Sequence, residues 1–189
     1  LLGAATKSAQ YPFHAWLPGA MVAPTPVSAY LHSATMVKAG VYAIARFAPV
    51  FAAAHPGWRV FVVAVGAWSM VAGGVRALRE HDLKLILAYG TISQLGFMVV
   101  LFGLGDASTV FAGCAVLVAH AVFKAALFMV VGIVDHGLGT RDVRRIPRDA
   151  GTGWGTTRAV AIVAAASMAG VPLTLGFVAK EVALDAAAM

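Results

Sequence analysis

The sequence predicts an all-α protein, a polytopic transmembrane helical bundle, and its composition supports this directly. Of the 189 residues, 60% are hydrophobic and only 12% are charged, whereas soluble domains carry about 25% charged residues. The apolar residues form continuous runs close to the ~20 residues that a helix needs to cross a bilayer. A transmembrane β-barrel would show short segments of alternating polarity instead. We therefore expect about six membrane spans.

The predicted spans are separated by breaks rich in proline, glycine or charge, which are typical of loops. In chain order, the spans cover residues 1–17, 27–47, 58–77, 83–103, 110–134 and 158–188. The chain opens inside one apolar segment and stops inside another. We therefore expect residues 1–189 to form a single transmembrane region, a fragment of a longer subunit.

The net charge of +6 is distributed as in a membrane protein. If six spans alternate in direction, the third and fifth loops face the same side of the membrane. These loops and their edges carry most of the basic residues: Arg76, Arg79, Lys84, Arg141, Arg144, Arg145, Arg148 and Arg158. The positive-inside rule makes this side cytoplasmic. The rule explains the basic balance without a nucleic-acid partner, and it predicts a cytoplasmic loop at residues 135–157.

Several ionisable residues lie well inside apolar segments, namely Lys7, Lys38, Lys124, Lys180, His32 and His120. Four lysines in such positions would cost on the order of 10 kcal/mol of insertion free energy. Snorkelling lowers this cost near a helix end, but Lys124 lies about ten residues from either end of its span. Its ammonium must therefore meet a side chain, an unwound backbone or water inside the bundle.

The burial of these groups points to proton transfer. Desolvation disfavours the charged form of a lysine, so that a buried lysine can exchange a proton near neutral pH, and histidine already titrates in that range. His120 and Lys124, at positions i and i+4, lie about 6 Å apart along one helix face. A line of such groups across a membrane is a proton relay. Two alternatives remain open: lysines paired statically with carboxylates, and histidines hydrogen-bonded in the core.

Two helices are predicted to be discontinuous, near Pro12 and near Pro172. Proline removes a backbone donor and interrupts a helix, and each of these prolines lies near a lysine, Lys7 or Lys180. Transporters use broken helices of this kind at ion sites. A packing kink without function is the alternative.

Motifs for other chemistry are missing from the sequence. We find no glycine-rich phosphate loop, dinucleotide fingerprint, nucleophile elbow or cysteine cluster, and Cys114 is the single cysteine. We therefore expect no cofactor and no metal. Haem ligation by His32 and His120 is disfavoured by the neighbouring Lys124, and a purely structural membrane scaffold remains the other alternative.

Four motifs in the same order resemble one known superfamily. They read "KSAQYPFHAWLPGAMVAPTPVSAYLHSATMVKAGVYAIAR", "DLKLILAYGTISQLGFM", "HAVFKAALFMVVGIVDHGLGTRDVRRI" and "MAGVPLTLGFVAKE". Together they resemble the antiporter-like subunits shared by respiratory complex I and the Mrp-type cation/proton antiporters. The segment "VDHGLGTRDVRRI" is most similar to the large, A-type subunit of the Mrp antiporters. The resemblance implies an inverted-repeat fold, with residues 1–47 ending the first repeat and residues 58–189 forming most of the second.

The resemblance also implies roles for single residues. Lys7 and Lys180 match the lysines of the two broken helices, and His32 matches the histidine that links the two half-channels. His120 and Lys124 match the connecting histidine and the central lysine of the second half-channel. Supporting residues are Lys84 of the "DLK" motif, Glu181, and Lys38, where complex I commonly has a neutral residue. The glutamate that pairs with the first lysine in the family lies upstream of this sequence.

The resemblance predicts the proton-translocating subunit of a multisubunit Na⁺/H⁺ antiporter in the bacterial plasma membrane. Its partners would be other membrane subunits, protons and a monovalent cation. Such a protein is a secondary transporter and not an enzyme. The alternative is the large proton-pumping membrane subunit of NADH:quinone oxidoreductase.

Overall fold

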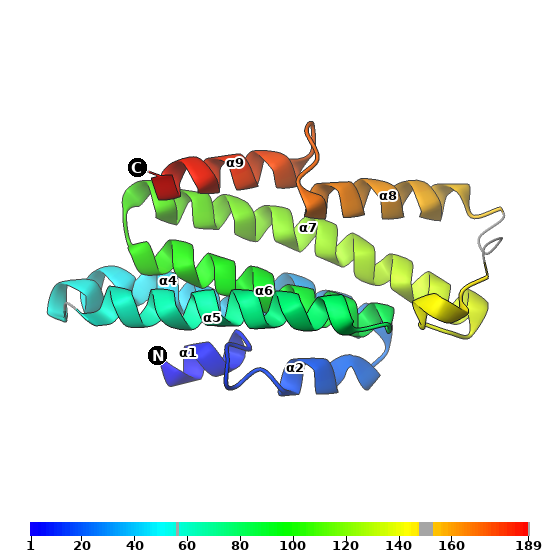
Figure 1. Ribbon diagram of the computed structural model, residues 1–189, viewed down its shortest axis with the longest axis horizontal. Coiled ribbons are helices and arrows are strands. Elements are labelled where there is room, and N and C mark those ends of the chain that lie inside the picture. The colour runs from blue at the N-terminus through cyan, green and yellow to red at the C-terminus, as the bar shows by residue number, and fades with distance from the viewer. Residues whose placement is uncertain (56, 148–152, 189) are drawn as a thin grey trace.

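The computed structural model describes residues 1–55, 57–147 and 153–188. The first part of the chain folds into α1 (Leu2–Lys7), α2 (Trp16–Gly19), the 3₁₀ turn η1 (Ala20–Val22), α3 (Thr25–Ser28), the π-helical segment η2 (Ala29–Thr35) and α4 (Met36–Ala54). The rest folds into α5 (Gly57–Arg79), α6 (Leu83–Leu104), α7 (Ala107–Leu138), the 3₁₀ turn η3 (Val143–Arg145), α8 (Gly155–Ala169) and α9 (Leu175–Ala188). The long helices run side by side, as Figure 1 shows. The predicted all-α bundle is confirmed.

Within the described residues, three helices, α5, α6 and α7, are long and apolar enough to cross a membrane. They contain the predicted spans 58–77, 83–103 and 110–134 and extend beyond them. The 32 residues of α7 measure about 48 Å at 1.5 Å per residue, which exceeds the ~30 Å of a bilayer's hydrocarbon core. The predicted span 27–47 lies within α3, η2 and α4, which follow one another without a break.

The first and last predicted spans are both interrupted. After α1 the chain leaves the helix for residues 8–15, which include Pro12, and α8 and α9 are separated by residues 170–174, which include Pro172. Both predicted discontinuities are therefore confirmed. In the described residues the six predicted spans correspond to four continuous helical stretches and two broken ones.

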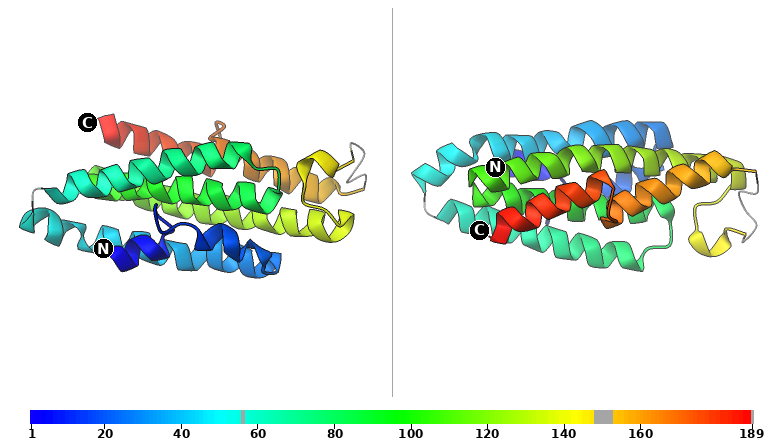
Figure 2. Two further views of the ribbon diagram at one scale, coloured as in Figure 1. Left: turned by 60° about the horizontal axis from the view of Figure 1, so that its bottom comes forward. Right: turned by 90° about the horizontal axis from the view of Figure 1, so that it is seen from above.

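The two broken elements lie on opposite sides of the bundle. The half-helices α8 and α9 pack end to end along α7, while α1 packs against α4. Figures 1 and 2 show them on opposite sides of the long helices, with α6 and α7 between them. Because α6 also packs against both α4 and α5, it is the most buried of the three membrane-length helices.

Glycines bring α5 and α6 unusually close together. A Cβ atom added to Gly96 would lie 2.6 Å from both the Gly66 carbonyl oxygen and the Met70 nitrogen, and one added to Gly66 would lie 2.8 Å from the Gly96 carbonyl oxygen. Small residues at such crossings let helix backbones approach each other in a membrane, where packing replaces the hydrophobic effect. The central position of α6 therefore depends on these glycines.

Ion pairs join the loops at one end of the bundle. The Arg141 guanidinium lies 3.1 Å from the Asp82 carboxylate and 3.9 Å from that of Asp135. In the same loop the Arg144 side chain donates hydrogen bonds to the Asp142 carboxylate, which lowers the pKa of Asp142 to about 2. The loop after α7 is thereby fastened to the start of α6. Arg148, one of the arginines counted for this loop, lies outside the described residues.

We expect Gly96→Ala to destabilise the protein, because the new methyl group would overlap backbone atoms of α5 that have no room to move. Overpacking of this kind costs about 1–3 kcal/mol of unfolding free energy. Gly74→Ala is the matched control, since a Cβ atom there meets only the Ser93 hydroxyl at 3.5 Å. The measurement is the thermal unfolding midpoint of the purified complex in detergent. Equal midpoints for the two variants would contradict the close crossing.

Candidate functional site

Lys124 is buried at the centre of the bundle. Its side chain is 1% exposed, although it belongs to α7, the longest helix. Its Nζ donates a hydrogen bond to the carbonyl oxygen of Leu87 on α6 at 3.0 Å, and the hydroxyl of Thr91 donates to the same oxygen at 2.8 Å. Among the three kinds of partner expected from the sequence, the structure therefore shows the backbone. The carbonyl, however, belongs to an intact helix and not to an unwound segment.

His120 lies one turn before Lys124 on α7 and is completely buried. Neither of its ring nitrogens has a hydrogen-bond partner among the described residues. Its ring packs edge-on against Phe123, with the ring centroids 5.5 Å apart. Buried polar groups without partners are rare and costly, so the alternative of a hydrogen-bonded core histidine is not what the described residues show.

His32 and Lys38 approach this group from the neighbouring helical stretch. Both are buried, and neither the Lys38 ammonium nor the His32 Nδ1 atom has a hydrogen-bond partner in the described part of the chain. The segment η2, which contains His32, packs against α7, and Lys38 is close enough to His120 for their charges to interact. The structure thus buries four of the predicted residues, His32, Lys38, His120 and Lys124, on η2, the start of α4 and α7, and we call them the buried His/Lys group.

His32 lies in a π-helical turn that the sequence analysis did not predict. Segments of π-helix are uncommon and occur frequently at functional sites. Within this segment the Ser33 hydroxyl donates to the Ala29 carbonyl and the Thr35 hydroxyl donates to the Tyr30 carbonyl. Hydroxyl groups that return to the backbone in this way perturb helices. The two hydroxyl residues were the available signal, but they are too common to have indicated a π-helix.

Lys180 lies at the second discontinuity. Its Nζ donates to the carbonyl oxygens of Met168 at 2.8 Å and Ala169 at 2.9 Å, the last residues of α8. Helix C-termini carry partial negative charge that favours a cation. Lys180 therefore lies at the break and contacts the last carbonyls of α8. Glu181, the next residue, is exposed.

A cavity of about 230 Å³ connects the surroundings of Lys180 with α6. It is lined by Met70, Ser93, Gln94, Phe97, Lys180 and Leu184. Ser93 and Gln94 directly follow the turn of α6 that meets Lys124. The α6 helix therefore presents polar groups to Lys124 and, one turn further along, to Lys180.

Lys84 occupies a different place, at the first turn of α6. Its buried ammonium donates to the carbonyl oxygens of Ala23 at 2.6 Å, just after η1, and of Met21 at 3.3 Å, within η1. The backbone amide of Lys84 is capped by the Asp82 carboxylate at 2.8 Å. Lys84 therefore fastens the end of η1 to the start of α6.

Lys7 lies apart from the other predicted residues. It is the last residue of α1, and its side chain is exposed, contrary to the burial expected from its apolar surroundings. The physical reason is that α1 packs on one side of the bundle, against α4, and ends at Lys7. The structure does not bring Lys7 to the buried group.

Lysine–carboxylate pairs were the main alternative to a relay. Within the described ranges every ion pair joins an arginine to a carboxylate, and none involves a lysine. Lys84, Lys124 and Lys180 are instead bound by main-chain carbonyls. Sequence reasoning missed both the Leu87 carbonyl and Gly90, where a Cβ atom would lie 2.9 Å from the Lys124 Nζ.

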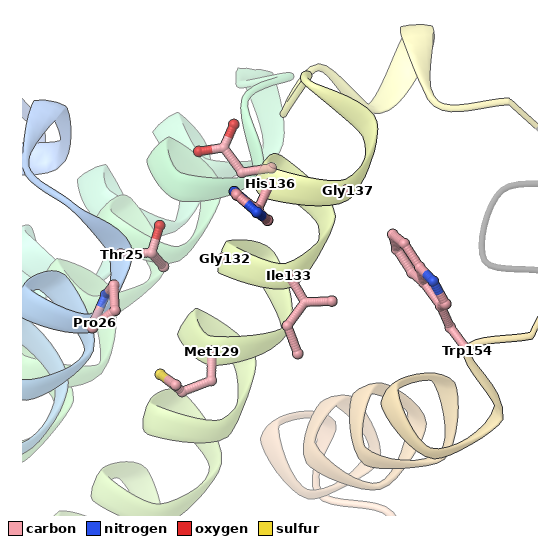
Figure 3. Close-up of a pocket in the computed structure, with 9 residues that line it drawn as sticks. Thr25, Pro26, Met129, Gly132, Ile133, His136, Gly137 and Trp154 are labelled. Carbon is pink, nitrogen blue, oxygen red and sulfur yellow. The ribbon is translucent and has the colours of Figure 1, made fainter.

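A larger cavity, of about 740 Å³, lies at the C-terminal end of α7. Its lining comprises Thr25, Pro26, Met129, Gly132, Ile133, Asp135, His136, Gly137 and Trp154. Figure 3 shows Thr25 and Pro26 on one side of α7 and Trp154 on the other. The cavity contains none of the predicted relay residues, although His136 lies three turns beyond Lys124 on the same helix.

Comparison with known proteins identifies the family. Residues 1–189 match the family described as NADH:quinone oxidoreductase/Mrp antiporter, TM. The chain is 53% identical over 188 residues to the A/B-type subunit of a probable K⁺/H⁺ antiporter of Rhizobium meliloti, covering 96% of this chain and 18% of that protein. It is 50% identical over 192 residues to the A-type subunit of the Na⁺/H⁺ antiporter of Bacillus subtilis, covering 96% and 24%.

A solved structure gives the same result. The Mrp complex from Dietzia sp. DQ12-45-1b contains a chain that superposes with a TM-score of 0.85 at 50% sequence identity, over 97% of this chain and 20% of that one. The present chain thus spans a quarter or less of the length of these relatives. With the family match over its full length, the chain belongs to the NADH:quinone oxidoreductase/Mrp antiporter transmembrane family and is a membrane-integral helical protein.

Proposed function

We propose that this chain is part of the proton-translocating subunit of a multisubunit monovalent cation/proton antiporter. The observation that carries the proposal is the Lys124 ammonium, which is fully buried and bound to a neutral carbonyl without a carboxylate beside it in the described residues. An uncompensated charge in such a place is costly, and a group that releases its proton avoids the cost part of the time. Relatives named as subunits of Na⁺/H⁺ and K⁺/H⁺ antiporters support the same function.

The relay that we propose runs through the buried His/Lys group. His32 and Lys38 exchange protons with His120, and His120 exchanges them with Lys124 through the 6 Å or so of one helical turn. From Lys124 the proton passes along α6, where Ser93 and Gln94 line the cavity beside Lys180. Lys180 completes the relay at the broken helix.

Three further residues have less direct roles in this proposal. Lys84 fastens the turn after η1 to α6, which holds the start of the α3–α4 stretch against the helix that receives Lys124. Lys7 belongs to the first broken helix, and its glutamate partner in the family lies upstream of this sequence. Glu181 is exposed beside Lys180 and would act from the surface.

An antiporter is favoured over the membrane subunit of NADH:quinone oxidoreductase, which shares the family. Subunits named for cation/proton antiport are about half identical to this chain over nearly its full length. The protein would then be a secondary transporter, not an enzyme. Its partners would be other membrane subunits, with residues 1–47 ending one structural repeat and residues 58–189 forming most of the next.

We also propose an orientation in the bacterial plasma membrane, with the loop of residues 135–157 in the cytoplasm. The described arginines of this loop and its edges, together with Arg76 and Arg79, lie at the same end of the bundle, where Arg141 joins the loop to the start of α6. An excess of arginine favours the cytoplasmic side.

Cysteine labelling tests the orientation. In a Cys114→Ser background, Val143→Cys should be labelled by a membrane-impermeant maleimide in everted vesicles and should stay unlabelled in intact cells. Both Val143 and His55 are exposed, and His55 lies in the connection between α4 and α5 at the other end of the bundle (Figure 1). His55→Cys is therefore the matched control, and it should be labelled in intact cells. The reverse pattern would contradict the orientation.

Substitution of Lys124 tests the relay. We expect Lys124→Ala to lower antiport by roughly 100-fold or more, the lower range of what a positioned proton-transfer group contributes. Lys124→Arg should be nearly as damaging, because arginine keeps its proton at all physiological pH values. His120→Ala should slow transport less, since a water molecule can replace one member of a relay. The measurement is cation-dependent ΔpH dissipation in everted vesicles that contain the complete complex.

Two comparisons make this experiment decisive. Val122→Ala, on the exposed side of α7, should leave both antiport and the amount of assembled complex unchanged. Full antiport in Lys124→Arg would mean that a fixed positive charge is sufficient at this position, and the relay role would then be excluded.

A further inference from the structure

We infer that Gly90 and Thr91 of α6 are positioning residues that determine how readily Lys124 holds its proton. The inference rests on the proposed function, in which Lys124 exchanges protons. It concerns the surface of α6 against which the ammonium lies, which we call the ammonium seat: the Leu87 carbonyl, Gly90 and the Thr91 hydroxyl.

The Leu87 carbonyl is the only acceptor that the described residues offer to Lys124, and it is shared. Its oxygen accepts from the Lys124 Nζ at 3.0 Å and from the Thr91 hydroxyl at 2.8 Å. In a regular helix the same oxygen also faces the backbone amide of residue 91. A carbonyl oxygen has two lone pairs, so three donors compete for two acceptor positions.

Gly90 provides the space through which the ammonium reaches this oxygen. A Cβ atom at Gly90 would lie 2.9 Å from the Lys124 Nζ, and apart from its chain neighbours Tyr89 and Thr91 no other described side chain or neighbouring-helix atom lies within 4 Å of it. The other glycines of α6 that allow a close contact differ, because Gly96 and Gly103 face α5. Glycine is less favourable than alanine inside a helix, and at Gly90 the Lys124 ammonium lies beside the space that a side chain would fill.

Burial makes this small set of contacts decisive. Thr91 is 0% exposed and Lys124 is 1% exposed, so bulk water does not replace a lost contact. Hydrogen bonds to an ionised group are about twice as strong as neutral ones. Access to the Leu87 oxygen therefore stabilises the protonated form of Lys124 over the neutral form.

The remaining ionisable groups around α7 do not take over this role. On α7 itself lie His120, the exposed Cys114 and, at the far end of the helix, His136 and Asp135, whose carboxylate lies near Arg141. The elements packed against α7 contribute Tyr30 and His32 on η2, Lys84 and Tyr89 on α6, Arg158 on α8 and Lys180 on α9. Lys38, near the start of α4, is also buried, and its ammonium has no hydrogen-bond partner in the described residues. The carboxylates of α9, Glu181 and Asp185, are exposed, and α3 has no ionisable side chain. The buried groups near Lys124 are thus cationic or neutral, which leaves the carbonyl as its acceptor.

The two residues act in opposite directions. In Gly90→Ala the methyl group displaces the ammonium from the carbonyl, so the protonated form loses its acceptor and the pH profile of antiport moves toward acid. In Thr91→Val, which preserves side-chain shape, the competing hydroxyl disappears and the oxygen is left to Lys124. The pH profile then moves toward alkali. Each shift should be about 0.5–1 pH unit, the equivalent of one ordinary hydrogen bond.

The experiment measures antiport in everted vesicles with the complete complex across pH 6–10 (about the usable range around a titrating lysine and histidine). The matched controls are Gly74→Ala, where a Cβ atom has ordinary contacts, and Thr109→Val, which removes a hydroxyl bonded to the Asp106 carbonyl away from any lysine. Both controls should keep the profile of the unmodified protein. The double variant Gly90→Ala/Thr91→Val should keep the acid shift of Gly90→Ala, because a displaced ammonium no longer senses the hydroxyl.

The outcomes separate the inference from the proposed function. Three results would overturn the ammonium seat even though Lys124→Ala still abolishes antiport. These are unshifted pH profiles in both variants, pH profiles shifted in the same direction in both, and equal shifts in the controls. Full antiport in Lys124→Ala would overturn both the relay and the seat. If Gly90→Ala lowers the amount of complex on immunoblots, the alkaline shift of the pH profile of Thr91→Val alone tests the ammonium seat, and the absence of that shift would overturn it.

Discussion

The binding of three lysine ammonium groups, those of Lys84, Lys124 and Lys180, by main-chain carbonyls is the constraint on which the rest of this structure depends. A regular helix uses its own carbonyls, and an apolar bundle offers few other acceptors. The fold therefore makes carbonyls available in three ways: the turn at residues 21–23 for Lys84, the end of α8 for Lys180, and a shared oxygen beside Gly90 for Lys124. In each of these three arrangements, the carbonyl oxygens lie where a lysine ammonium needs an acceptor.

The choice of a carbonyl instead of a carboxylate has a chemical consequence. A carboxylate would neutralise a buried ammonium and favour the charged form strongly. A carbonyl dipole stabilises the charge but leaves it uncompensated, so the protonated and neutral forms stay closer in free energy. Four of the described carboxylates, those of Glu80, Asp82, Asp135 and Asp142, lie near the loops and pair with arginines instead. In the proposed relay, this separation would keep permanent ion pairs at the end of the bundle and exchangeable protons in its interior.

The sequence was sufficient to predict the helical class, most of the spans, both discontinuities and the register of His120 and Lys124. Those features depend on local composition, on proline chemistry and on the 3.6-residue helical period. The sequence could not identify the acceptor of the Lys124 ammonium. Every residue has a backbone carbonyl, and that of Leu87 becomes the acceptor only because α6 and α7 cross beside it. The exposure of Lys7 was missed for a related reason, since it depends on where α1 ends and on which side of α4 it packs. The π-helix around His32 has no composition of its own and could not be predicted.

The second discontinuity shows how a charged group can change its state without loss of the local fold. The break between α8 and α9 is held by neutral contacts: Gly176 donates its amide to the Ser167 hydroxyl at 3.1 Å, and the Thr174 hydroxyl accepts from the Phe177 amide at 3.2 Å. Gly170 closes α8 in a left-handed conformation at φ 84°, which glycine adopts without strain. Lys180 adds its ammonium to carbonyls at a helix end that these contacts already define. Because contacts other than those of the lysine also hold the break, loss of the Lys180 proton in the proposed relay would weaken its hydrogen bonds and leave the backbone in place to accept the next ammonium.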